Sequence, residues 1–213
     1  MKKFFTIIVA ACMLMPVCAG NVQKSLDKAL AKAQKKEMSQ KMKEYKKGGY
    51  EILGSRTMEV ALLKHYSKLN ELGDNGLVFE GYAANTKSKN TAEQMALNNA
   101  TIKYAQKAGS TIKGRVVSDI FADGTDSEGE FEKFYAAYER IVEQKVKNVL
   151  VPSYSVIKQK PDGTYEIQSF FIVDETKARN ARKAALESAL TESELAQKYA
   201  ASVRGFVEET VAE

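Results

Sequence analysis

Hydrophobic positions recur at intervals of three and four residues after residue 20, and this is the spacing of one helical face. Lysines occupy many of the positions between them. Gly48 and Gly49 follow, and glycine commonly ends helices because it accepts a left-handed backbone. The apolar positions of the repeat are Val22, Leu26, Ala29, Leu30, Ala33, Met38, Met42 and Tyr45. The pattern predicts a basic amphipathic helix within residues 20–49.

After this helix the pattern alternates between helix and strand. A short apolar stretch at 50–53 precedes a helical repeat that Ser55 can cap and that reaches about Leu72. The segment 73–76, Gly-Asp-Asn-Gly, is a strong turn signal. Residues 77–86 then read as a strand.

A stripe of small residues marks the next predicted helix. Thr91 and Gln94 are spaced as a capping box for its first turn. The stripe suits close packing on a sheet and consists of Ala92, Ala96, Ala100, Tyr104 and Ala108. Enrichment in β-branched residues over 112–121 predicts a second strand there.

The second half of the chain contains the clearest amphipathic helix. Its apolar stripe is Phe131, Phe134, Tyr135, Tyr138, Ile141, Val142, Val146 and Val149. Strands are predicted at 151–158 and 165–173, joined by the hairpin signal Pro-Asp-Gly-Thr at 161–164. The pattern is helical from about Glu175 to the end of the sequence. A capping box at 191–194 can start a second helix, so one long helix and two shorter helices fit the pattern equally well.

This order of elements predicts an α+β fold: a small, mostly antiparallel sheet with helices on one face, and extra helices at both ends. The expected divisions are a signal peptide at 1–19, the basic helix at 20–49, an α+β domain at 50–187 and a C-terminal helical extension at 188–213.

The first residues have the three parts of a secretory signal. Lys2 and Lys3 form a basic start, residues 4–17 are apolar, and the small-residue site at 17–19 precedes Gly20. The apolar run is shorter than the roughly 20 residues that a membrane-spanning helix needs. Export to the periplasm or the outer-membrane periphery is therefore expected.

Both cysteines lie inside this segment. Cleavage after Ala19 leaves a mature chain without cysteine, which excludes disulfides, thiolate nucleophiles and sulfur metal ligands. An alternative stays open, in which Cys12 or Cys18 becomes an acylated N-terminus and anchors the protein to a membrane.

The net charge of +5 is unevenly distributed. Residues 21–47 contain nine lysines and three acids, whereas the chain from Gly48 on is slightly acidic. The candidate contact residues for an anionic surface are Lys24, Lys28, Lys32, Lys35, Lys36, Lys41, Lys43, Lys46 and Lys47. The expected partner is an envelope protein or an anionic surface, not nucleic acid, because the chain is exported. Contacts between copies, or a solvated helix that only packs back on the domain, are the alternatives.

Catalytic chemistry has little support in the sequence. His65 is the only histidine and falls on an apolar stripe, which predicts a partly buried residue with a satisfied ring. Hydrolases that rely on Ser-His-Asp, Cys-His or zinc need more partners than this chain offers. Acids on predicted strands, Glu80, Glu166 and Asp174, leave a carboxylate-dependent envelope hydrolase as the alternative function.

Residues 119–130 partly match a calcium-binding loop. Asp119, the Asp123-Gly124 pair and Glu130 fit the spacing, but Phe121 and Asp126 occupy positions that the motif gives to a ligand and to an apolar residue. We therefore expect a solvated loop, with no metal and no cofactor in the protein.

The stretch 77–187 resembles a known family. The resemblance rests on the strand Val-Phe-Glu-Gly-Tyr-Ala at 78–83, on alanines at 92, 96, 100, 105 and 108, and on the paired segments 149–151 and 165–167. It is similar to the LPP-twenty type of small bacterial surface lipoprotein, and to the related N-terminal domain of flagellar assembly protein T. The resemblance implies an envelope location, often the outer membrane, and no established reaction. The sequence thus predicts a non-catalytic structural or binding and assembly module.

Overall fold

The computed structural model describes residues 16–120 and 128–208, with side chains described for 28–120 and 131–208. The predicted signal peptide therefore lies largely outside the described residues, as does most of the loop at 119–130. The chain divides into two compact units, Met1–Glu44 and Tyr45–Glu213.

Most of the first unit is a single helix, α1 (Pro16–Lys47), which continues into the start of the second. Its last turn carries Lys46 and Lys47, and cations are favourable there because the helix dipole is negative at its C-terminus. Gly49 follows with φ +74° and donates its N–H to the carbonyl of Lys46 at 3.2 Å. The glycine pair thus ends the helix as its sequence predicts.

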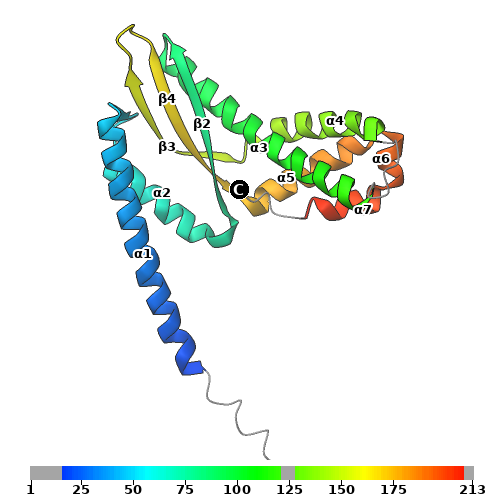
Figure 1. Cartoon of the computed structure of the whole chain (residues 1–213), viewed down its shortest axis with the longest axis horizontal. Helices are drawn as coiled ribbons and strands as arrows, with labels where there is room; N and C mark the ends of the chain where they lie inside the picture. The colour runs from blue at the N-terminus through cyan, green and yellow to red at the C-terminus, as the bar shows by residue number, and fades with distance from the viewer. Residues whose placement is uncertain (1–15, 121–127, 209–213) are drawn as a thin grey trace, which may run out of the picture. The chain divides into compact units, whose positions relative to one another are not determined.

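The second unit is built on a four-stranded antiparallel sheet, which confirms the predicted α+β class. The strands are β1 (Glu51–Ile52), β2 (Gly76–Thr86), β3 (Leu150–Gln159) and β4 (Tyr165–Asp174), in the order β1-β3-β4-β2 (Figure 1). The hairpin between β3 and β4 has Gly163 at φ +81°, as its turn residues predict.

The predicted strand at 112–121 is wrong, because most of this segment continues the helix α3 (Lys89–Asp119). Ile112 and Val116 extend the buried alanine stripe at helical spacing, with 1% and 0% of their surface exposed. Burial on this face outweighs the β-preference of branched side chains. The N-cap of α3 is Ser88, whose side chain accepts a hydrogen bond from the N–H of Thr91. The predicted capping box of Thr91 and Gln94 therefore does not start this helix.

Helix α3 covers one face of the sheet at very short range. Ala92, Ala96 and Ala100 are fully buried, and a Cβ added at Gly81 in β2 would lie 1.8 Å from the carbonyl oxygen of Ala96. The small residues of both elements therefore permit this approach, as the stripe predicts.

Four further helices complete the core: α4 (Glu128–Val146), α5 (Glu175–Leu190), α6 (Glu194–Lys198) and α7 (Ala200–Phe206). The aromatic stripe of α4 is buried as predicted, with Phe131, Phe134 and Tyr138 fully enclosed. The chain also breaks between α5 and α6, where Ser193 caps α6. Val203 of α7 is buried in the same core.

Helix α2 (Met58–Leu72), capped by Thr57 and not by the predicted Ser55, is followed by the short η1 (Gly73–Asn75). It lies against the other face of the sheet, so helices cover both faces and the predicted placement of helices on one face is wrong. The ring of His65 packs edge-on against Tyr154, which stacks on Phe170 with centroids 4.5 Å apart. Phe170 and its neighbour Phe171 point to opposite faces, since side chains alternate along a strand, and Phe171 belongs to the core beneath α3.

Candidate functional site

The nine predicted contact lysines all belong to α1. Those whose side chains are described and exposed are Lys28, Lys32, Lys35, Lys36, Lys43, Lys46 and Lys47. Because successive helical residues are about 100° apart, these seven lie within a sector of about 120°. We call this sector the lysine face. Helix formation therefore gathers charges that are scattered in the sequence.

The acidic residues of the described part of α1 lie outside the lysine face. Glu37 and Glu44 are on the other side of the helix, and Lys41, which also lies outside the sector, forms an ion pair with Glu37 at 3.3 Å. Among the described side chains of α1, the seven lysines of the lysine face form no ion pair. Their charges are consequently available to an external anion.

The end of α1 is fixed to the sheet of the second unit. Tyr45 is 9% exposed, and its hydroxyl lies 3.2 Å from that of Tyr154 on β3. Its ring also meets the ring of Tyr50 edge-on, with centroids 6.2 Å apart. The two tyrosines therefore flank the glycine pair and hold the segment between α1 and β1.

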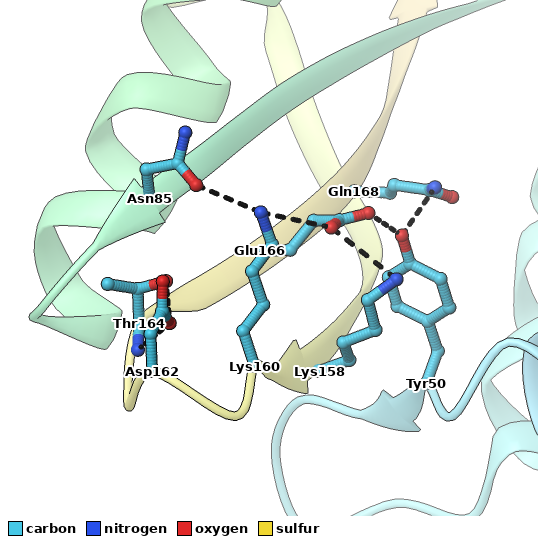
Figure 2. Close-up of polar contacts among 8 residues, drawn as sticks. All are labelled: Tyr50, Asn85, Lys158, Lys160, Asp162, Thr164, Glu166 and Gln168. Carbon is cyan, nitrogen blue, oxygen red and sulfur yellow. Dashed lines mark hydrogen bonds and ion pairs between the residues drawn. The ribbon is translucent and has the colours of Figure 1, made fainter.

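A second anchor is a polar cluster on the same face of the sheet (Figure 2). The hydroxyl of Tyr50 donates to the carboxylate of Glu166 on β4 and accepts from the amide of Gln168 at 3.2 Å. Lys158 lies 3.4 Å from the same carboxylate and 4.6 Å above the ring of Tyr50. Lys160, from the hairpin, forms a longer ion pair with Glu166 at 3.8 Å. These five residues form the Tyr50–Glu166 cluster.

Burial, hydrogen bonds and nearby charges shift the pKa values of the two central groups, Glu166 and Tyr50. Burial raises the pKa of Glu166, but the hydrogen bond from Tyr50 and the charge of Lys158 outweigh it, so the pKa is lowered. Burial and the bond to Glu166 raise the pKa of Tyr50. At neutral pH the carboxylate is ionised and the phenol is protonated, and the phenol donates its hydrogen bond to the carboxylate. The arrangement is suited to holding the residue that precedes β1 against the strands β3 and β4.

The three strand acids considered for hydrolysis do not come together. Glu80 lies opposite Phe170, four residues along β4 from Glu166, which corresponds to about 13 Å. Asp174 is farther along the strand and caps α5 by accepting the N–H of Thr176 at 3.0 Å.

One acid, Glu175, is buried within the described part of the chain, and Arg182 compensates its charge. The guanidinium donates to both carboxylate oxygens, at 3.0 and 2.5 Å, and also to the hydroxyl of Tyr104. Burial alone would lower the pKa of Arg182, yet its bonds to Glu175 and Tyr104 raise it. Burial also raises the pKa of Tyr104 to about 12. The group is a closed ion pair inside the core.

His65 is buried, with 2% of its surface exposed, as its place on the apolar stripe predicts. Its Nδ1 lies 2.9 Å from the hydroxyl of Ser153 on β3. The described residues contain no group of three histidine, cysteine, aspartate or glutamate side chains able to hold a metal ion.

Seven of the nine lysines predicted from the sequence form the lysine face, whereas the Tyr50–Glu166 cluster was not predicted. Part of the signal was present: the turn at 161–164 places Lys158 directly opposite Glu166 in the hairpin. The contribution of Tyr50 depends on a contact across 116 positions of the chain, which no local pattern reveals.

No family model, curated protein or solved structure matches this chain. The resemblance to the LPP-twenty type of lipoprotein therefore stays a prediction. Within the described ranges, no helix combines the length and the apolar character needed to cross a membrane.

Proposed function

We propose that this is an exported, non-catalytic binding or assembly module of the bacterial envelope, and that the lysine face of α1 binds an anionic surface. The observation that carries the proposal is the segregation of seven exposed lysines on one sector of α1, with Glu37 and Glu44 outside it. Export rests on the signal-like residues 1–19, and the envelope location also rests on the family resemblance.

The strength of such a contact follows from its charge. Each lysine close to an anionic lipid surface contributes about 1 kcal/mol, so four neighbouring lysines contribute about 4 kcal/mol, or close to a thousandfold in affinity. The attraction between exposed charges decays over about 8 Å at physiological salt. Binding should therefore be reversible and sensitive to salt.

The apolar positions of α1 favour surface contact over insertion. Between residues 16 and 47 the helix has alanine, leucine, valine and methionine, but no tryptophan or phenylalanine. Helices that bury a face in the lipid boundary commonly carry such large side chains. We propose contact with headgroups, acidic polymer or an acidic partner protein, without deep insertion.

The test is co-sedimentation of the mature protein with vesicles that contain anionic lipid. Replacement of Lys28, Lys32, Lys35 and Lys36 by glutamine should weaken binding by at least about 100-fold, since most of that 4 kcal/mol is lost. High salt should weaken wild-type binding to a similar extent.

The matched control removes the same charge from the second unit. Lys64, Lys133, Lys145 and Lys198 are exposed and form no ion pair with a described residue, and their replacement by glutamine should change binding less than tenfold. Equal losses in the two variants would show that net charge, and not the lysine face, is responsible. Binding that survives high salt would place the contact surface elsewhere.

A further inference from the structure

The second unit contains an open pocket of about 260 Å³ beside α2. The loop that joins β1 to α2 forms one wall, and an irregular part of β3 forms the other. Leu53 donates its N–H to the carbonyl of Ser155 at 2.9 Å, which ties the loop to the strand. Gly54 follows at φ +110°, a backbone conformation that favours glycine.

The β3 wall owes its shape to a bulge between Pro152 and Tyr154. Ser153 is the extra residue there, and bulges commonly re-aim a side chain in this way. Its hydroxyl is held by the Nδ1 of buried His65 at 2.9 Å, so its position at the pocket wall is fixed. The only histidine of the chain thereby supports the pocket.

The lining of the pocket mixes apolar and polar groups and includes one cation. Ile52 and Leu53 contribute apolar side chains to the lining, Tyr154 also borders the pocket, and Ser55 and Ser153 supply hydroxyl groups. Arg56 is exposed at the wall and forms no ion pair or hydrogen bond with a described residue. An unpaired guanidinium is a planar fork that matches a carboxylate.

We propose that this pocket binds a small organic monocarboxylate, with the carboxylate on Arg56 and the apolar body against Ile52, Leu53 and Tyr154. The volume lies just below the usual range of about 300–1,000 Å³ for ligand sites, which fits a molecule the size of a single aromatic acid better than a peptide or an oligosaccharide. The site is separate from the lysine face and does not depend on the proposed function.

Nuclear magnetic resonance titration of the mature protein with benzoate tests the proposal. Benzoate should shift the backbone amides of residues 52–56 and 153–154 with millimolar affinity. Benzamide, which has the same shape without the charge, should bind at least tenfold more weakly. Arg56→Gln should reduce benzoate affinity by a similar factor, while its spectrum reports that the fold is intact.

The matched control is Arg140→Gln, an exposed arginine on α4 outside the pocket, which should leave benzoate binding unchanged. The proposal is overturned if benzoate does not shift the amides of the pocket residues, or if the shifts are spread over exposed lysines. Equal affinity for benzamide, or an unaffected Arg56→Gln variant, overturns it as well.

Discussion

At the scale of single residues, the close approach of α3 to β2 depends on Gly81. The strand β2 and the helix α3 meet backbone to backbone there, and no side chain fits between them. Gly114, within the same helix, has no heavy atom within 4 Å of its would-be Cβ. Gly81 is therefore required by packing, whereas Gly114 only lowers the helix propensity of α3.

Gly81→Ala should destabilise the protein by about 3 kcal/mol, because the sheet and the helix must move apart to admit the methyl group. Gly114→Ala should stabilise it by up to about 1 kcal/mol, since alanine is the better helix former. Urea unfolding followed by circular dichroism measures both. A neutral Gly81→Ala variant would mean that α3 does not approach β2 this closely.

At the scale of elements, the Tyr50–Glu166 cluster connects the residue just before β1 with the strands β3 and β4. Glu166 is ionised in the folded state with a lowered pKa, whereas an unfolded chain titrates near the ordinary value for glutamate. A lowered folded-state pKa contributes stability above the unfolded pKa, and this stability is lost as the pH falls through the folded-state pKa.

Glu166→Gln should therefore be less stable than the wild type at pH 7. The difference should shrink as the pH falls below about 5, because the wild-type carboxylate becomes protonated. Free energies of unfolding at several pH values test this expectation. Glu93→Gln, at an exposed position of α3 without an ion pair to a described residue, is the control. A difference between wild type and Glu166→Gln that stays constant with pH would contradict the role assigned to the cluster.

At the scale of the whole molecule, the chain consists of a helical unit to Glu44 and a compact unit from Tyr45. The core of the second unit uses residues of α3, α4, α5 and α7, and Tyr45 is the first buried side chain of the described chain. The second unit therefore contains the contacts that a cooperative fold requires.

Deletion of residues 21–44 should leave the second unit folded, with a thermal midpoint within about 4 °C of that of the full mature chain. This corresponds to a change of about 1 kcal/mol in the free energy of unfolding. Deletion of residues 21–47 should lower the midpoint further, because it also removes the buried ring of Tyr45 and its contact with Tyr154. Circular dichroism melts compare the two. A large loss from the shorter deletion would favour the alternative in which α1 mainly packs on the domain.

The local elements could be predicted because their determinants are close together in the chain. The stripe of α4 repeats within one or two turns, and the hairpin turn at 161–164 and the glycine pair after α1 act on adjacent residues. Helical spacing likewise places the lysines of α1 on one face. The α+β class and the candidate lysine face were therefore accessible from the sequence.

Only the tertiary structure decided the remaining features, because they depend on which surfaces meet. Branched residues near Ile112 favour a strand by local preference, whereas burial beneath other helices selects the helix. The order of the strands brings Tyr50 to Glu166, 116 positions away in the chain. The bulge brings Ser153 to His65, which lies 88 positions away. Contacts at such separations arise from packing, whereas periodicity reports only neighbours along the chain.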